Sequence, residues 1–344
     1  MSFSTRPEPK KPDRLTVMSW AGGWGEALLE AVSNPFTALT GIPVHHEINI
    51  GLKLPAKLTN ALEAGERPPV DVVWCNAVPA LDAAQRDWTD PLDENSPEGM
   101  ISALEALHPR SRPEGFGTRW PFVQPYVVHY VLAYRTKLFG KDKPESWQVL
   151  FEPRFKEKVA LYPGGSGFYP IAQKLGGGSL DDIPDNMEPC WKIFSQLKNQ
   201  VGQLDYSIGM GEQIRREKLD LCFRALTNAI TFKNEGLDIS WTAPREGIPD
   251  TIDALWVPKN LPENSAYWAK HFIQFALSRN TQEAWCERLG TLPLHPQAAL
   301  PTVYRGHPEL PQSPDDGKGV LHLPESLKLR CQKDWEIRFQ KIFL

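Results

Sequence analysis

The sequence contains no run of about 18 consecutive apolar residues, the length that a membrane-spanning helix needs. It also lacks an excess of basic residues, because 38 lysines and arginines stand against 42 aspartates and glutamates, a net charge of -4. This balance gives no electrostatic footprint for general nucleic-acid binding. The 344 residues have the length of about two domains, and a hydrophobic content of 41% is too high for intrinsic disorder. We therefore expect a soluble, two-domain protein of the α/β class.

The five cysteines are widely spaced and include no CxxC pair. This spacing argues against a zinc ribbon or a thioredoxin-type site. Cys75, Cys222 and Cys286 lie in apolar segments, which predicts buried free thiols, since unpaired cysteine packs as a small hydrophobic residue. A single disulfide is also compatible with the sequence, whereas a framework of disulfides is not indicated.

The first 13 residues, MSFSTRPEPKKPD, contain three prolines and no apolar segment of the kind found in a signal peptide. We expect this tail to be disordered. Two explanations stay open at this point: the protein is cytoplasmic, or a signal peptide has already been removed from the chain.

Segments with strand and helix patterns alternate from residue 15 onward, which is typical of a parallel sheet with right-handed crossovers. Residues 87–121 interrupt the alternation with charges and prolines, and we expect a long surface connection there. The predicted strands are 15–20, 43–48, 70–74, 126–134, 158–161, 219–223, 238–242 and 252–257. The predicted helices are 24–40, 54–64, 167–175, 187–198, 211–218, 227–235, 264–277 and 280–290.

Two glycine clusters follow predicted strands, but neither completes a catalytic or cofactor-binding motif. In the cluster Gly22–Gly25, a dinucleotide-binding GxGxxG loop would need a further glycine where Leu28 stands. In the cluster Gly164–Gly167, a GxSxG nucleophile elbow would need glycine where Phe168 stands. The segment His45–Glu47 has no third metal ligand nearby. The sequence thus offers no assembled catalytic set, and we expect no cofactor and no metal.

Aromatic and polar residues lie at the predicted carboxyl ends of several strands, where open α/β sheets bind ligands. Arg224 directly follows the apolar segment LDLCF, a place where a charge needs a partner. Each such residue also has a plain structural explanation, because tryptophan is usually buried and arginine usually exposed. The other candidates found in this way are Trp20, Gly23, Trp24, Asn76 and Ser166. Tyr126 is a further candidate, because it lies at the apparent passage from one α/β set to the next.

Six segments, in order, resemble the extracellular solute-binding proteins of ABC importers, in the branch that includes polyamine-binding proteins. They are LTVMSWAGGWGEALLEAVSNPFTALTGIPV, VDVVWCNAVPALDAA, QPYVVHYVLAYRTKLF, SWQVLFEPRFKEKVAL, APREGIPDTIDALWVPKN and SAYWAKHFIQFALSRNTQEAWCERLGTLPLHPQA. The resemblance extends from about residue 15 to residue 297.

This resemblance implies a two-lobed periplasmic-binding-protein fold of type II, with crossover strands near Val127 and Val257 and a hinge motion that closes on one small ligand. Lobe 1 would comprise residues 14–127 and 259–344, and lobe 2 residues 128–258. It also implies a periplasmic location after removal of a signal peptide, an ABC permease in the inner membrane as partner, and a monomer.

The resemblance places Trp20 at a ligand-stacking position of polyamine binders, Phe223 at a second aromatic contact, and Asp253 at the carboxylate that holds an ammonium. Two departures matter. The segment PGGSG at 163–167 stands where the polyamine branch has acidic residues, and Thr251 stands where it has a ligand-contact tryptophan. A polyamine would then keep unpaired ammonium groups, which are costly to bury.

The residues that replace them favour a ligand with both charges. Gly165, Ser166 and Gly167, at the start of a predicted helix, offer N–H groups and a hydroxyl to an anion. Arg224 adds a planar donor for a carboxylate, and Asp253 a partner for an amine. We expect an amino acid, an ω-amino acid or a sugar–amino-acid conjugate. The alternatives are a polyamine or, from another class, an enzyme of the same bilobal architecture such as a transferase; ferric-iron capture would use adjacent tyrosines, which the sequence lacks.

Overall fold

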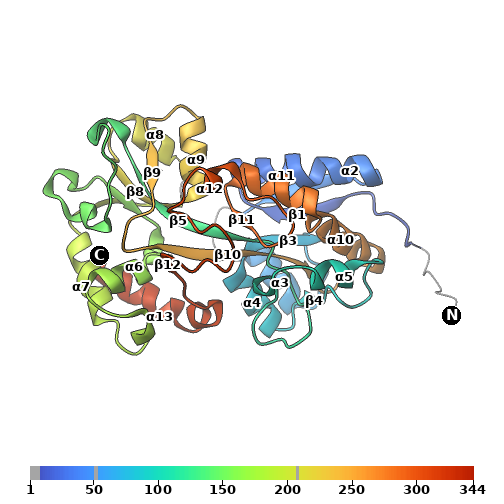
Figure 1. The fold of residues 1–344 in the computed structure, drawn as a ribbon. Coiled ribbons are helices and arrows are strands. Elements are labelled where there is room, and N and C mark those ends of the chain that lie inside the picture. Colours follow the sequence, from blue (N-terminus) through green and yellow to red (C-terminus); the bar gives the residue numbers. More distant parts are fainter. Residues whose placement is uncertain (1–7, 50–52, 207–208) are drawn as a thin grey trace. The chain divides into compact units, whose positions relative to one another are not determined.

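The computed structural model describes residues 8–49, 53–206 and 209–344, which form a mixed α/β protein, as predicted (Figure 1). The chain divides into two compact units. Unit 1 comprises the residues up to Pro125, Asp253–Trp285 and Leu294–Ala298. Unit 2 comprises Tyr126–Ile252, Cys286–Pro293 and Ala299–Leu344.

The sheet of unit 1 is built on β1, which pairs in parallel with β2 on one side and β3 on the other. β3 pairs in turn with the second half of β10, and this pairing is antiparallel. The short strand β4 pairs antiparallel with the end of β10. The bounds are β1 (Leu15–Ser19), β2 (Val44–Ile48), β3 (Val72–Asn76), β4 (Thr89–Asp90) and β10 (Ile248–Pro258).

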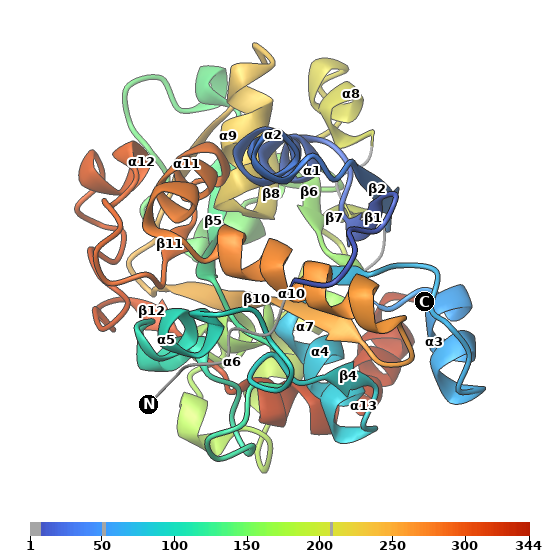
Figure 2. The same cartoon turned by 90° about the vertical axis from the view of Figure 1, so that its right-hand side faces the viewer.

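Seven α-helices of the described chain begin in unit 1. In Figure 2, α1 and α2 are seen nearly end-on as one coil. A π-helical turn at Leu29–Ser33 joins them, just before Pro35. Proline has no N–H to donate to the carbonyl four residues earlier, so the helix widens there. The bounds are α1 (Gly23–Leu28), α2 (Asn34–Thr40), α3 (Ala56–Glu63), α4 (Ala77–Gln85), α5 (Met100–Glu105), α10 (Glu263–Ala276) and α11 (Arg279–Leu289).

The sheet of unit 2 is built on β5, which is buried along its whole length. β5 pairs antiparallel with β8, β9, β11 and the first half of β10. β6 pairs in parallel with β7 and β8, and β12 in parallel with β10. The bounds are β5 (Tyr126–Tyr134), β6 (Val159–Leu161), β7 (Val201–Leu204), β8 (Leu221–Ala225), β9 (Ser240–Thr242), β11 (Leu292–Pro293) and β12 (Val320–Leu321).

The helices of unit 2 include a long C-terminal helix that the sequence did not predict as such. They are α6 (Tyr169–Leu175), α7 (Glu188–Leu197), α8 (Met210–Arg215), α9 (Leu226–Asn234), α12 (Thr302–Arg305) and α13 (Glu325–Phe343). α13 packs on α6 and α7, where Trp335 lies 4.8 Å from the ring of Tyr169 and Phe339 lies 5.0 Å from the ring of Phe194 (Figure 1). Residues 299–344 therefore belong to unit 2, whereas the predicted division assigned them to the first lobe.

The prediction of a parallel sheet does not hold for β5 and β10. Both strands pair antiparallel with their main neighbours, so the sheet is mixed. The handedness rule for parallel strands applies where a helix connects them. β5 is instead reached through the irregular segment 106–125, and its direction is not set by a crossover helix.

The predicted disordered tail is ordered in its described part. Residues 1–7 lie outside the described residues. In the segment 8–13, the carbonyl of Pro9 accepts a hydrogen bond from Trp268 Nε1 at 3.2 Å, and the carbonyl of Lys10 accepts one from Asn264 Nδ2 at 3.2 Å. This segment thus lies against α10 of the same unit.

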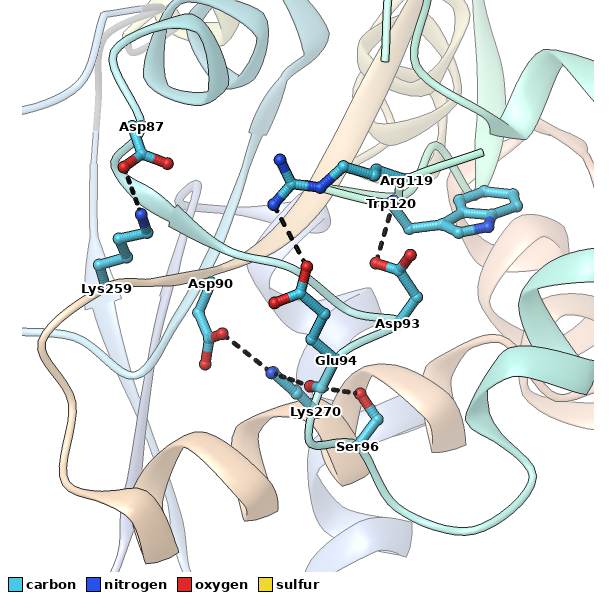
Figure 3. A network of polar contacts seen from close by, with 9 residues as sticks. All are labelled: Asp87, Asp90, Asp93, Glu94, Ser96, Arg119, Trp120, Lys259 and Lys270. Carbon is cyan, nitrogen blue, oxygen red and sulfur yellow. Dashed lines mark hydrogen bonds and ion pairs between the residues drawn. The ribbon is translucent and has the colours of Figure 1, made fainter. Parts of the chain in front are cut away.

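The predicted surface connection 87–121 is partly buried and is fixed by a buried lysine (Figure 3). Lys270 of α10 is 1% exposed, and its Nζ donates to the carbonyl of Glu94 at 2.6 Å and lies 3.0 Å from Asp90 Oδ1. The same figure shows the pair formed by Lys259 and Asp87, which is exposed. The two lysines hold one segment of chain, but only Lys270 does so away from water.

We expect Lys270→Met to lower the free energy of unfolding by about 1–3 kcal/mol, because it leaves the Glu94 carbonyl and the Asp90 carboxylate without their buried donor. Lys259→Met is the matched control and should change it by no more than about 0.5 kcal/mol, as exposed pairs contribute little. Urea unfolding of the two variants provides the measurement. Equal, small shifts of both midpoints would show that Lys270 does not hold the segment.

Candidate functional site

The first group of predicted site residues lies at one edge of the unit 1 sheet. The rings of Trp20 and Trp24 are 5.6 Å apart, and each meets Trp74 of β3, at 4.8 and 6.0 Å. Trp74 is fully buried, whereas Trp20 and Trp24 are half-buried. Trp20 and Trp24 each pack against the buried ring of Trp74 and are themselves partly exposed, so each can also contact a ligand. Their positions are compatible with the prediction that they bind a ligand.

The positions of Trp20 and Trp24 depend on a close contact between the backbone of Gly25 and that of Trp20. α1 begins at Gly23, directly after the loop that follows β1. A Cβ on Gly25 would lie 2.4 Å from the carbonyl oxygen of Trp20, so only glycine allows α1 to begin so close to the strand end. The glycines at 22–25 therefore serve the turn, and they bring Trp24 next to Trp20.

Asn76 and Asp253 form the polar part of the same group. They are directly opposite each other in the antiparallel pairing of β3 and β10, and Asn76 Nδ2 donates to Asp253 Oδ1 at 2.8 Å. Asp253 is 1% exposed. Asn76 Oδ1 is buried and accepts no hydrogen bond from any residue that the structure describes. Because Trp74 and Asn76 are two residues apart on β3, they lie on the same face of the sheet.

The second group lies in unit 2 and contains Arg224. The sequence placed this residue after a strand, but it is the fourth residue of β8 and is 0% exposed. Its Nε donates to Met210 Sδ at 3.0 Å, its Nη1 to the carbonyl of Phe223 at 2.6 Å, and its Nη2 to the carbonyl of Asp205 at 3.1 Å. The guanidinium also lies 4.5 Å from the ring centre of Tyr162.

All of these partners are neutral. Among the described residues, Arg224 makes no ion pair with a carboxylate. Arg135 of the same unit shows the ordinary arrangement: it is also buried, and its guanidinium lies 2.6 Å from Glu217 and 3.0 Å from Asp220. A buried guanidinium without a negative partner is costly, so Arg224 is a candidate for contact with an anion that comes from outside the chain.

Tyr162 and Asn228 accompany Arg224 and were not predicted. Tyr162 OH donates to Asn228 Oδ1 at 3.1 Å and accepts from the N–H of Ala225 at 3.3 Å. The sequence did carry a signal for Tyr162, since it directly follows the strand β6, where other candidates were sought. Asn228 lies in the first turn of α9, and only the fold brings it to the tyrosine.

Phe223 and Tyr126, both predicted as ligand contacts, lie in the core of unit 2. The ring of Phe223 stacks on that of Tyr130 at 4.9 Å and is enclosed by Trp147 and Phe168. Tyr126 is the first residue of β5 and is fully buried. Their positions are those of packing residues.

The segment Gly165, Ser166 and Gly167, where an anion site was predicted, forms a turn before α6 and is not the start of this helix. α6 begins only at Tyr169, and the N–H groups of Gly165 and Ser166 donate to the carbonyls of Tyr162 and Pro163, at 3.1 and 3.4 Å. These two donors are therefore used within the turn. A Cβ on Gly165 would lie 2.7 Å from the ring of Phe339, so this glycine allows α13 to pack closely. Gly167 has a φ of +77°, which favours glycine.

All five cysteines lie in the described part of the chain and are free thiols, as predicted for Cys75, Cys222 and Cys286. Burial raises the pKa of Cys75 to about 12 and that of Cys222 to about 11, so both are protonated at neutral pH. Within the described ranges, no three His, Cys, Asp or Glu side chains are placed to hold a metal ion. None of the described helices is long and apolar enough to cross a membrane.

Comparison with known proteins decides the family. The family model of the bacterial extracellular solute-binding proteins matches residues 31–312 of this chain. The chain belongs to this family. The proteins of this family bind solutes for ABC transporters, and the resemblance found in the sequence is thereby confirmed at this level, although the polyamine branch is not. No curated protein matches the chain in sequence.

Solved structures of this solute-binding fold match the chain over nearly its whole length. One is the periplasmic binding protein AgtB from A. tumefaciens R10 in complex with agropinic acid, with 18% identity, coverage of 97% of this chain and 99% of that one, and a TM-score of 0.76. The Atu4243-GABA receptor has 19% identity, coverage of 96% and 98%, and a TM-score of 0.76. An ABC transporter substrate-binding protein from Bradyrhizobium japonicum USDA 110 has 17% identity, coverage of 97% and 100%, and a TM-score of 0.78. They confirm the predicted periplasmic-binding-protein fold.

The thiols give a direct check of the core. Cys331 is the one cysteine of the five that is not buried. We expect one thiol per chain to react promptly with Ellman's reagent in the native protein and all five to react after unfolding in guanidinium, without reductant, because no disulfide is present. Prompt reaction of several thiols, or fewer than five after unfolding, would contradict this packing.

Proposed function

We propose that this solute-binding protein captures a small carboxylated or zwitterionic solute, such as an amino acid, an ω-amino acid or a sugar–amino-acid conjugate, for an ABC importer. The observation that carries the proposal is the buried guanidinium of Arg224, which is surrounded by neutral partners. A ligand carboxylate would supply the missing negative charge and match the planar donor geometry of arginine.

Met210 offers the place where such a carboxylate would bind. Its sulfur accepts from Arg224 Nε at 3.0 Å, and a thioether is the weakest acceptor of the three that Arg224 uses. Methionine is also the most adaptable apolar side chain, so it can move at little cost. In this proposal the carboxylate takes the place of the sulfur, and the carbonyls of Asp205 and Phe223 keep the guanidinium oriented.

Unit 1, taken by itself, carries groups that suit the amine of such a solute. Asp253 supplies a buried carboxylate for an amine, Asn76 orients it, and the unpaired Asn76 Oδ1 is a further acceptor for an N–H group. Trp20 and Trp24 would stack on an alkyl chain or a sugar ring. The structurally similar GABA receptor and the similar protein in complex with agropinic acid support this class of solute, since GABA itself carries an ammonium and a carboxylate.

A polyamine is less well supported as the solute. It has no carboxylate, and a buried arginine would repel its ammonium groups. The segment 163–167 contributes no acidic side chain that could offset this repulsion. We propose further that the protein acts as a monomer in the periplasm and delivers its solute to an inner-membrane ABC permease.

The central test is calorimetry with zwitterionic solutes selected by a thermal-shift screen. Arg224→Ala should lower the affinity for the carboxylated solute by roughly thirtyfold or more, the effect of removing one partner of a buried charge pair. The variant should also discriminate less than the wild type between this solute and its amide analogue. Arg216→Ala, which removes an exposed arginine of the same unit, is the matched control and should bind as the wild type does.

Two outcomes would contradict the role of Arg224. One is wild-type affinity in the Arg224→Ala protein. The other is an equal loss of affinity for the solute and for its amide analogue, because a general defect of folding would weaken both. Circular dichroism of the variant before titration separates loss of fold from loss of the contact.

For the half-buried Trp20, we expect Trp20→Ala to weaken solute binding by about 1–3 kcal/mol and to leave the melting temperature of the free protein nearly unchanged. Trp285→Ala is the matched control: its ring is fully buried against Trp74 at 5.0 Å, and its removal should cost about 3–5 kcal/mol of stability. A large loss of melting temperature in Trp20→Ala would show that Trp20 is a core residue.

A further inference from the structure

A hollow that is lined by none of the candidate site residues lies at the amino-terminal end of α10 in unit 1. Its volume is about 410 Å³. One wall is the segment that precedes β1, and the other is the first turn of α10. The lining residues that matter here are Lys10, Lys11, Arg14, Arg67, Asn264 and Ser265.

The end of α10 offers unused backbone donors. The helix has 14 residues, its N-cap is Pro262, and no side chain caps it. The N–H groups of Asn264 and Ser265 have no acceptor among the described residues. The aligned peptide dipoles of a helix this long place a partial positive charge at this end, which favours an anion.

Ser265 is the independent observation that points to a ligand. The residue lines the hollow and is only 6% exposed, yet its hydroxyl has no hydrogen-bond partner among the residues that the structure describes. Its hydroxyl oxygen is not among the fully buried atoms, so it stays accessible to a ligand in the hollow. A ligand oxygen in the hollow would accept from this hydroxyl and from the N–H of the same residue.

The side chains around the hollow are predominantly basic. Four cations and one carboxylate, that of Asp13, line it. Among the residues that the structure describes, only Arg67 forms an ion pair with a carboxylate, that of Asp71, at 3.4 Å. The segment that bears Lys10 and Lys11 is fixed, since Asn264 Nδ2 donates to the carbonyl of Lys10 and Lys11 Nζ to that of Thr40 at 2.7 Å. Three of the four cations, those of Lys10, Lys11 and Arg14, are therefore attached to an anchored segment beside the helix end.

We propose that this hollow binds a phosphate group, with the N–H groups of Asn264 and Ser265 and the hydroxyl of Ser265 as direct donors and the four cations as counter-charges. Its volume exceeds that of one phosphate ion, so a phosphate monoester or the headgroup of a phospholipid also fits. The proposal is independent of the solute proposed above, because it uses none of the same residues.

The test uses the full chain and two probes. Inorganic phosphate is titrated by calorimetry at low ionic strength, and sedimentation is measured with vesicles of phosphatidylglycerol against vesicles of phosphatidylcholine. We expect saturable binding of phosphate, or selective binding of the phosphatidylglycerol vesicles, and these two results identify the source of the group. Ser265→Asp should lower that binding about tenfold or more, because its carboxylate occupies the anion position.

Ser265→Asp should keep its melting temperature, since an acidic residue in the first turn suits the helix dipole. Arg14→Glu is a second variant that leaves the helix unchanged and should also weaken binding. Lys57→Glu is the matched control, with the same change of charge on the exposed face of α3, away from the hollow. The proposal is overturned if neither probe binds, if Ser265→Asp binds as the wild type does, or if Lys57→Glu weakens binding as much as the two variants.

Discussion

Strand β10 is the element on which the rest of the structure depends, because its two halves belong to different units. Its residues Asp250–Ile252 pair with β5, and its residues Asp253–Trp256 pair with β3. A strand satisfies its backbone donors and acceptors only where its neighbours are in register. A slip by one residue would turn every side chain of β10 to the opposite face. The same register that holds both sheets therefore also places Asp253 opposite Asn76.

The buried charges of the protein fall into two kinds. Lys270 and Arg135 have negative partners within the chain, and their pairs fix segments of the fold. Asp253 accepts a hydrogen bond from the amide of Asn76, and Arg224 donates to two carbonyls and a thioether and lies over a ring. The guanidinium of Arg224 is therefore held in place without a carboxylate partner among the described residues, as the binding of a charged ligand requires. This contrast supports the proposed capture of a solute that carries a carboxylate.

Local pattern was sufficient to predict some elements and not others. The strand Tyr126–Tyr134 was predicted at its observed bounds, because six of its nine residues are tyrosine or valine, which favour a strand. The break at Leu29–Ser33 was missed, although Pro35 was its visible cause. The direction of β10 and the place of α13 depend on contacts between residues far apart in sequence, which no periodicity records.

The site shows the same limit. The apolar neighbours of Arg224 in the sequence predicted that its charge needs a partner. Only the placement of Met210, Asp205 and Tyr162 around it showed that no described residue supplies a negative one. The glycines of the segment 163–167 suggested an anion site, whereas their hydrogen bonds and the rings packed against them assign them to the turn. Identical residue types serve either purpose, and only three-dimensional contacts distinguish them.

The account rests on the claim that the solute brings a negative charge to Arg224. The most direct measurement is mass spectrometry of the small molecules released on denaturation from protein that was purified natively and never refolded. The account predicts a stoichiometric compound that carries a carboxylate, together with an amine. Release of a polyamine or a neutral sugar without any carboxylate would contradict it.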